Sequence, residues 1–312
     1  MFNKIIKNNS KLFLIIKLFL IILICIFINI KYKIKVCICT IGKLENLYIR
    51  EYLEYYNKLG VDKIIIYDNN EINGEYFETI IYDYIIKNYV SIINFRGYLK
   101  PQIKMMKNCY KRNYLKYDWI IFIDIDEFLY LKNYSSIKKY LKEDKFNKCK
   151  IIYLNFIFYS DNNFLYYKNK SVISRFKERS FNNKRYWGKS IIRGHIAGLN
   201  ITSPHRLTTK IQPCNGFGKK SKSFKIDSKY YYIKHYSFKS TEEYCNKLNR
   251  GNILFDNDYK IKLSKINKYF QYNRITLNKI NLLENKTGIN LDYFRNKIKN
   301  YKKKENNLIK FI

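Results

Sequence analysis

The feature that most constrains the fold is a short apolar run that ends in three carboxylates, residues 118–128, DWIIFIDIDEF. Its β-branched and aromatic residues are typical of a buried central strand. Side chains alternate along a strand, so Asp124 and Asp126 are expected to face the same way. Two carboxylates at the carboxyl end of such a strand suit Mg²⁺ or Mn²⁺, and open α/β sheets bind ligands at that edge. A cation there is able to hold a diphosphate.

Asp-x-Asp alone is weak evidence, because acidic residues are also common in turns, so the rest of the chain must supply the context. Strands are predicted over 35–41, 61–67 and 89–95, alternating with helices over 44–59, 75–87 and 102–116. This βαβαβαβ order predicts a largely parallel sheet with right-handed crossovers. No glycine-rich phosphate loop follows the first strand, which disfavours a dinucleotide-dependent dehydrogenase or a P-loop enzyme.

The pattern after the acidic run is mixed. A short helix is predicted over 136–142, strands over 150–158 and 230–237, and a helix from Thr241 to about Arg250. His235 stands near the end of the last strand and is a candidate third metal ligand, although a lone histidine is usually structural. Trp187 belongs to a polar stretch; an indole stacks well on sugars, but a buried tryptophan is the commoner case.

The charge is strongly positive, with 60 Lys and Arg against 25 Asp and Glu and a formal net charge of +35. Such a charge raises a nucleic-acid or anionic-membrane partner as an alternative. The lysines are spread over the whole chain, so a solvated basic surface is preferred and nucleic-acid binding is disfavoured. Seven cysteines show no zinc-type spacing, and the sequence leaves open whether they are free or paired in an oxidising lumen.

The N-terminal stretch 12–30 is almost wholly apolar and interrupted by Lys17. Its length is near the ~20 residues that cross a bilayer. Lysines flank both sides, which makes the topology ambiguous, and no small-residue cleavage site follows, which disfavours a signal peptide. We expect a single-pass type II signal anchor, with the bulk of the chain facing the ER or Golgi lumen. The predicted organisation is an anchor over 1–34, a domain over 35–251 and a basic helical extension over 252–312 that packs on the domain or contacts the membrane.

An ordered set of motifs carries a family resemblance over about residues 35–251. These motifs are CTIG at 39–42 with Glu45 and Asn46, YLEYYNKLGVDKIIIYDNN at 52–70, Gln102, Cys109, WIIFIDIDEF at 119–128, KSII at 189–192, HYSFKS at 235–240, Lys247, and RG at 250–251. The chain resembles the GT-A-type glycosyltransferases of the family 92 (DUF23) group and their family-2-like relatives. The resemblance implies a GT-A, Rossmann-like α/β domain with a mostly parallel sheet.

The resemblance also implies a nucleotide-sugar donor, with a UDP-sugar preferred, and a glycan or other hydroxyl acceptor. Asp124, Asp126 and His235 would bind Mn²⁺ or Mg²⁺, and Lys189 would neutralise the leaving diphosphate. The nucleoside would be met by Asp68 and Asn69 and by the loop from Thr40 to Glu45, with Gln102 and Asp124 also at the donor. The family's Lys-Asn-Glu after the first strand stands here as residues 42–46, GKLEN, so the register of Glu45 is altered.

The implied chemistry is an inverting displacement in which a carboxylate deprotonates the acceptor hydroxyl. Asp161, in the polar turn after strand 150–158, is the first candidate for this base, and Glu178 and Glu242 are rivals. Two other readings stay open: a catalytically silent relative that binds a glycan or a partner, and a basic nucleic-acid or membrane binder. Acceptor choice depends on variable loops, so the sequence does not name the acceptor.

Overall fold

The computed structural model describes residues 16–22, 33–99, 101–182, 187–205, 211–220, 229–250 and 259–309. The chain forms two compact units, Met1–Lys35 and Val36–Ile312. The described part of the first unit includes a helix over 16–22, and the rest of the predicted anchor lies outside the described residues. No helix among the described residues combines the length and apolarity needed to cross a bilayer.

The first half of the second unit follows the predicted alternation of strands and helices. Its elements are β1 (Val36–Gly42), α2 (Asn46–Lys58), β2 (Lys63–Asp68), α3 (Glu78–Ile86), β3 (Val90–Asn94), α4 (Gln102–Asn113) and β4 (Trp119–Phe122). β1 pairs with β2 and β4, and β2 pairs with β3, all in parallel. The predicted parallel arrangement is therefore present in these four strands.

The second half differs from the prediction, because its strands make the sheet mixed. They are β5 (Glu127–Leu131), β6 (Ile151–Phe158), β7 (Gly188–Arg193) and β8 (Tyr231–His235), in the sheet order β3-β2-β1-β4-β7-β6-β8-β5. Only β6 and β8 pair in parallel; β7 runs antiparallel to β4 and β6, and β5 runs antiparallel to β8. The helices in this half, α5 (Ile137–Leu141) and α6 (Val172–Arg175), are far shorter than those of the first half, and the regular strand–helix alternation that builds parallel crossovers is lost.

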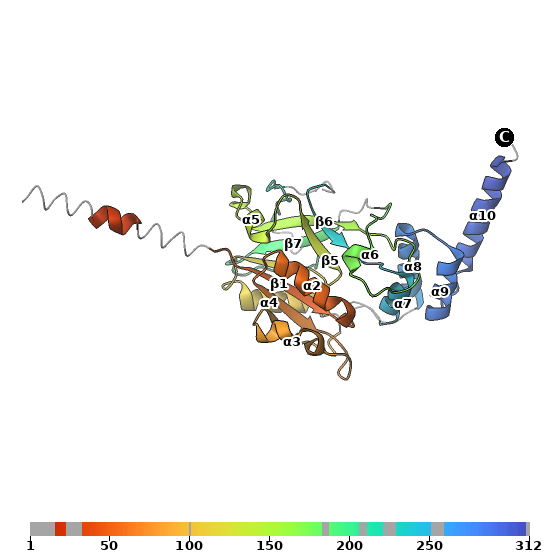
Figure 1. The fold of residues 1–312 in the computed structure, drawn as a ribbon, viewed down its shortest axis with the longest axis horizontal. Helices are drawn as coiled ribbons and strands as arrows, with labels where there is room; N and C mark the ends of the chain where they lie inside the picture. Colours follow the sequence, from red (N-terminus) through yellow and green to blue (C-terminus); the bar gives the residue numbers. More distant parts are fainter. Residues whose placement is uncertain are drawn as a thin grey trace, which may run out of the picture. The chain divides into compact units, whose positions relative to one another are not determined.

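The C-terminal helices gather at one end of the sheet, and α10 extends away from it (Figure 1). They are α7 (Thr241–Asn249), α8 (Tyr259–Tyr272), α9 (Leu277–Thr287) and α10 (Asp292–Ile309). A capping box of Ser240 and Glu243 begins α7, and Gly288 ends α9 with a φ of 68° that suits glycine. Helices were predicted here, and Lys265 and Lys268 of α8 contribute to the lining of a cavity in the domain.

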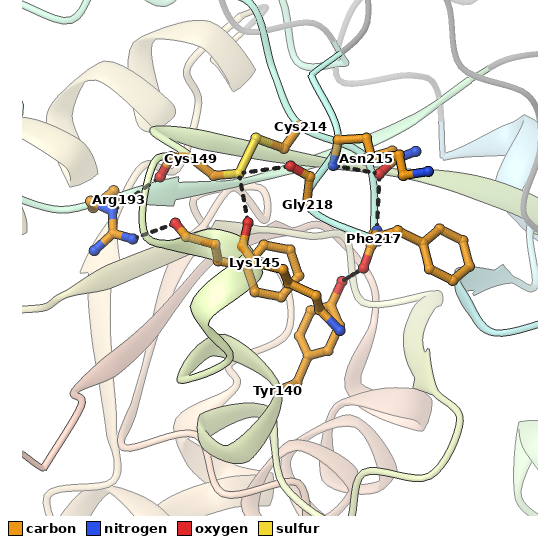
Figure 2. The surroundings of a disulfide bond; sticks show 11 residues. Tyr140, Lys145, Cys149, Arg193, Cys214, Asn215, Phe217 and Gly218 are labelled. Carbon is orange, nitrogen blue, oxygen red and sulfur yellow. Dashed lines mark hydrogen bonds between the residues drawn. A yellow bond between two sulfur atoms is a disulfide. The ribbon is translucent and has the colours of Figure 1, made fainter.

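Two disulfide bonds resolve the pairing that the sequence left open. Cys39 of β1 is bonded to Cys109 of α4, within a cluster that includes Met105 and Met106. Cys149 is bonded to Cys214, whose backbone N–H donates to the carbonyl of Ile151 at 2.8 Å. Figure 2 shows this second bond beside Tyr140 and Arg193. The first bond joins a strand to a helix, and the second joins the segment just before β6 to Cys214, which forms an isolated β-bridge with Ile152.

Candidate active site

A cavity opens where the direction of strand addition reverses. From β1 the chain adds β2 and β3 on one side and then crosses to place β4 on the other side of β1. Ligands of open α/β sheets bind at the carboxyl ends of the strands at such a point. The cavity there has a volume of about 280 Å³. Its lining includes Ile41, Lys43, Glu45, Gln102, Asp124, Ile125, Asp126, His205, His235, Ser237, Phe238, Tyr244, Lys247, Leu248, Arg250, Lys265 and Lys268.

Asp124 and Asp126 both line this cavity, but from a turn rather than from one face of a strand. β4 ends at Phe122 and β5 begins at Glu127. The Glu127 backbone N–H donates to the Asp124 carbonyl at 3.0 Å, and the Asp124 N–H donates to Glu127 Oε2 at 2.9 Å. The prediction that both carboxylates extend from one face of a strand was therefore wrong. The strand ends at Phe122, and these two hydrogen bonds form a turn at the carboxylates.

The pairing of β5 with β8 brings His235 opposite Glu127. His235 Nε2 lies 3.6 Å from Asp126 Oδ1 and 3.9 Å from Glu127 Oε1. Asp126, Glu127 and His235 each offer one possible metal-ligand atom, and these three atoms lie within 4.8 Å of one another. Glu127 Oε1 and His235 Nδ1 are buried without a hydrogen-bond partner, which is unusual for buried polar atoms. This combination of carboxylate and imidazole donors fits a divalent cation such as Mn²⁺.

The electrostatics of these three residues differ. Burial opposes ionisation of Asp126, but Lys247 and His235 outweigh it and hold the pKa of that carboxyl well below its ordinary range. Burial and the neighbouring Asp124 raise the pKa of Glu127 well above its ordinary value. Burial lowers the pKa of His235 despite the nearby Asp126 carboxylate, so its imidazole is neutral and able to ligate a metal.

Lys189, on β7, lies behind the acidic turn and is buried. Its Nζ is 2.8 Å from Asp124 Oδ2 and 3.8 Å from Glu127 Oε1. Burial disfavours the charged amine, but Asp124 and Glu127 overcome it and raise the pKa of Lys189 to about 12. Lys189 does not line the cavity, and its contacts are with the carboxylates of the acidic turn, whose charge it neutralises. No contact of Lys189 supports its predicted role at the leaving diphosphate.

Basic side chains line the cavity beside the acidic turn. Lys247 Nζ lies 2.7 Å from Asp126 Oδ2, and Arg250 Nη2 lies 2.6 Å from Glu45 Oε1. We call Lys43, Lys247, Arg250, Lys265 and Lys268 the basic wall; all five line the cavity. The motifs quoted from the sequence include Lys43, Lys247 and Arg250, but none of these three side chains was given a role of its own. The available signal was their spacing, since 247 and 250, and 265 and 268, are each three apart on a helical face.

The residues predicted to meet the donor are placed in two groups. Glu45 and Gln102 line the cavity, while Thr40 is buried within β1. Asp68 forms an ion pair with Arg96, whose Nη2 lies 2.6 Å from Asp68 Oδ2. Asn69 donates through Nδ2 to the Phe95 and Tyr98 carbonyls at 2.8 and 3.1 Å. Asp68 and Asn69 therefore fix the loops after β2 and β3 and do not line the cavity.

Asp161, the predicted base, is buried away from the cavity lining. Its Oδ2 lies 2.6 Å from Lys279 Nζ and also accepts a hydrogen bond from the Tyr269 hydroxyl, and its Oδ1 accepts from the Asn163 N–H at 2.9 Å. The prediction is corrected, because these contacts use both carboxylate oxygens. The rivals Glu178 and Glu242 also do not line the cavity; Glu178 is exposed and Glu242 accepts from the Tyr167 N–H.

The profile of glycosyltransferase family 92 matches residues 32–285. With the mixed α/β sheet and the acidic cavity, this match places the chain in the glycosyltransferase class. It belongs to glycosyltransferase family 92. A family 92 protein of Oryza sativa subsp. japonica is 30% identical over 111 residues, which are 34% of this chain and 18% of the relative. One of Arabidopsis thaliana is 30% identical over 101 residues, 32% of this chain and 17% of the relative.

Among solved structures, the chain is similar to S. aureus TarS 1-349 in complex with UDP-GlcNAc, with a TM-score of 0.37 and 14% identity over 81% of this chain and 80% of the other. It is also similar to the mannosyltransferase PcManGT of Pyrobaculum calidifontis in complex with GDP-Man and Mn²⁺. That match has a TM-score of 0.31 and 7% identity over 40% of this chain and 36% of the other. The aligned segments span less than a fifth of the curated relatives' length.

Proposed function

We propose that this chain transfers a sugar from a nucleotide-sugar donor to a hydroxyl group of a glycan or another acceptor. The observation that carries the proposal is the cavity at the sheet's switch point, which is lined both by the three carboxylates of Glu45, Asp124 and Asp126 and by the five cations of the basic wall. A site of this kind suits a diphosphate bridged by a cation. A UDP-sugar is the donor that we expect.

The donor atoms of Asp126, Glu127 and His235 would hold the divalent cation. The cation would neutralise charge on the departing diphosphate. This ligand set has Glu127 in place of Asp124 of the sequence-based set, because the ligand atoms of Asp126, Glu127 and His235 lie within 4.8 Å of one another and Glu127 keeps an oxygen without a hydrogen bond. Asp124 stays at the cavity, where its exposed edge is free to meet the donor sugar or ribose.

The basic wall would bind the diphosphate throughout the reaction. In an inverting transfer the acceptor oxygen bonds to the anomeric carbon as the bond from that carbon to the diphosphate oxygen breaks. The diphosphate keeps the electron pair, and the hydroxyl proton passes to a base. Lys247 and Arg250 are held in place by Asp126 and Glu45, so their charge is positioned before the donor arrives. Such preorganised charge stabilises a leaving anion without reorganisation cost.

We also propose that the domain works in an oxidising compartment, as the expected type II orientation requires. The support is the pair of bonds Cys39–Cys109 and Cys149–Cys214, since disulfides persist in secretory and extracellular environments. Non-reducing mass spectrometry of the chain from the secretory pathway would test it. Free thiols at these four positions would contradict the proposal.

The test of the main proposal is a donor screen with the full chain and Mn²⁺, in which released nucleoside diphosphate is measured for UDP- and GDP-sugars. Asp126→Asn and His235→Ala are expected to abolish release and to weaken Mn²⁺ binding measured by paramagnetic resonance. Asp83→Asn, in an exposed ion pair on α3, is the matched control and should change neither. Proton NMR of the product's anomeric signal tests inversion. Absence of binding to both UDP and GDP would overturn the proposal, and release that survives chelation would overturn the cation's role.

A further inference from the structure

We propose that Trp187, His205 and Lys268 form a subsite that binds the ring of an acceptor sugar beside the donor cavity. This inference rests on the proposed function, since it names where the second substrate would lie. The chemical class of the ligand is a pyranose, recognised by one stacked face and by hydrogen bonds to its hydroxyl groups.

Trp187 has a fixed backbone and an exposed ring. Its carbonyl accepts a hydrogen bond from the Phe156 N–H at 2.6 Å, at the start of the β6–β7 pairing. A side chain at the next position, Gly188, would lie 1.9 Å from the Leu154 carbonyl oxygen, so β6 and β7 approach closely beside Trp187. Yet Trp187 is 44% exposed, whereas Trp119 is 1% exposed. Trp119 therefore has the usual structural role of a tryptophan, a ring buried in the core, whereas Trp187 does not.

His205 and Lys268 connect this ring to the cavity. Both line the cavity. The centroid of the His205 ring is 4.9 Å from that of Trp187, and Lys268 Nζ is 5.5 Å from the Trp187 centroid. The three side chains thus combine an apolar face, an imidazole and an amine within the span of one sugar ring. Aromatic faces with a polar rim are the usual composition of sites for amphipathic ligands.

The imidazole of His205 is suited to accept a hydrogen bond from a hydroxyl. His205 Nδ1 lies 3.3 Å from the Gly188 carbonyl oxygen, a contact that only a protonated Nδ1 satisfies. Burial and the nearby Lys189 lower the pKa of His205 to about 4, so the ring is neutral at pH 7. The remaining nitrogen, Nε2, is then an acceptor. Lys268 supplies the complementary donor.

Two further rings place the subsite beside the metal-binding residues. The Phe156 centroid is 6.0 Å from that of His205 and 4.5 Å from that of His235. The Phe158 centroid is 4.9 Å from that of His235, and Lys268 Nζ lies 5.8 Å from it. A continuous aromatic wall thus runs from Trp187 to His235. A sugar stacked on Trp187 would present its hydroxyl groups toward the carboxylate end of the cavity.

The test measures glycoside binding to the full chain by saturation-transfer-difference NMR, with and without UDP and Mn²⁺. The probes are the methyl glycosides of β-glucose, β-galactose, α-mannose and β-N-acetylglucosamine. We expect at least one to bind saturably, with affinity about tenfold weaker in Trp187→Ala, partly restored in Trp187→Phe, and weakened in His205→Gln less than in Trp187→Ala. UDP affinity should stay within twofold in Trp187→Ala and in Trp187→Phe, because Trp187 does not line the donor cavity. Tyr82→Ala, an exposed aromatic on α3, is the matched control.

Two outcomes would overturn the subsite: saturable glycoside binding that survives unchanged in Trp187→Ala, or no saturable binding of any of the four probes. Each is distinct from failure of the proposed function, which would show as loss of UDP binding in the unaltered chain. Glycoside binding that depends on Trp187 in a chain without affinity for nucleotides would keep the subsite and remove the transferase.

Discussion

Two clusters in this molecule pair a carboxylate with a buried lysine, and they differ in how completely their polar atoms are hydrogen-bonded. In the first, Asp124 lies 2.8 Å from Lys189 beside the cavity; in the second, Asp161 lies 2.6 Å from Lys279 away from it. The second cluster is saturated, because Asp161 also accepts from Tyr269 and Asn163. The first leaves Glu127 Oε1 and a nitrogen of His235 without hydrogen bonds.

This difference distinguishes a cluster that only holds the structure together from one that is able to bind a ligand. Ion pairing with a buried lysine occurs in both clusters and does not distinguish them. Buried polar atoms without partners are costly unless a ligand, ion or water completes them. The saturated cluster joins the turn after β6 to α8 and α9, and through α8 it helps to hold Lys265 and Lys268 at the cavity. The C-terminal helices are therefore part of the site's construction.

The largest expected effect is a loss of stability when the hydrogen-bonded cluster around Asp161 is disrupted. Asp161→Asn removes the ionic partner of Lys279, whose side chain is 1% exposed. Breaking a buried pair from one side costs ~3–5 kcal/mol of unfolding free energy, because the remaining charge is stranded. Urea unfolding measures this loss. Asp126→Asn is the comparison, since its partner Lys247 is 30% exposed and stays accessible to water when the carboxylate is lost, and we expect a smaller change. Equal losses in the two variants would remove the distinction between the clusters.

The fully hydrogen-bonded ion pair of Arg175 and Glu243 should make the free energy of unfolding depend on pH in the acid range. Arg175 binds both oxygens of Glu243 at 2.7 and 2.9 Å. Burial opposes the charge, but the hydrogen bonds from Arg175 outweigh it and lower the pKa of Glu243 from 4.5 to about 2. The folded pKa is depressed, so the stabilisation is complete above about pH 4.5 and is lost as the pH falls toward 2. Its size is ~3 kcal/mol.

Glu243→Gln should therefore flatten the acid limb of the stability curve measured by urea unfolding between pH 6 and pH 3. Glu284→Gln, in the more exposed pair with Arg295, serves as the control and should leave that limb nearly unchanged. An acid limb that is the same in Glu243→Gln and in the unaltered chain would show that the Arg175 pair does not carry the linkage.

On the cavity side, Glu127→Gln tests whether the incomplete carboxylate is a ligand. The amide keeps one oxygen but loses the charge, so Mn²⁺ affinity should fall about 10- to 100-fold, an effect of the size that removing metal-site support usually has. Paramagnetic resonance of free Mn²⁺ measures it, again with Asp83→Asn as the control. Stability without metal should stay equal or rise, because a buried carboxyl with an unsatisfied oxygen is removed. Unchanged Mn²⁺ affinity would return Asp124 to the ligand set.

The sequence predicted the fold well in the first half, where each strand and helix follows from the local pattern of apolar residues. Residues 35–122 alternate apolar strands with amphipathic helices, and the carboxyl ends of their parallel strands converge, so Asp124 and Asp126 were found from pattern alone. The mixed half was not predictable in the same way, because strand partners such as β4 and β7 are chosen by tertiary packing. Asp161 shows the limit most clearly. A polar turn after a strand has the same sequence appearance whether it faces a cavity or meets Lys279 from α9, and only the packed structure decides.

The smallest expected effect concerns the contribution of α8 to the cavity. Lys265 lines the cavity and Lys262, one helical turn earlier, does not. If the basic wall binds a diphosphate, Lys265→Ala should weaken UDP affinity about fivefold, or ~1 kcal/mol, as expected for one solvated ionic contact. Lys262→Ala should leave it unchanged although it removes the same charge. Calorimetry at low and high salt separates the two cases, since a contact within the site keeps part of its effect when long-range attraction is screened. Equal weakening in both variants would mean that the helix acts only through the chain's general positive charge.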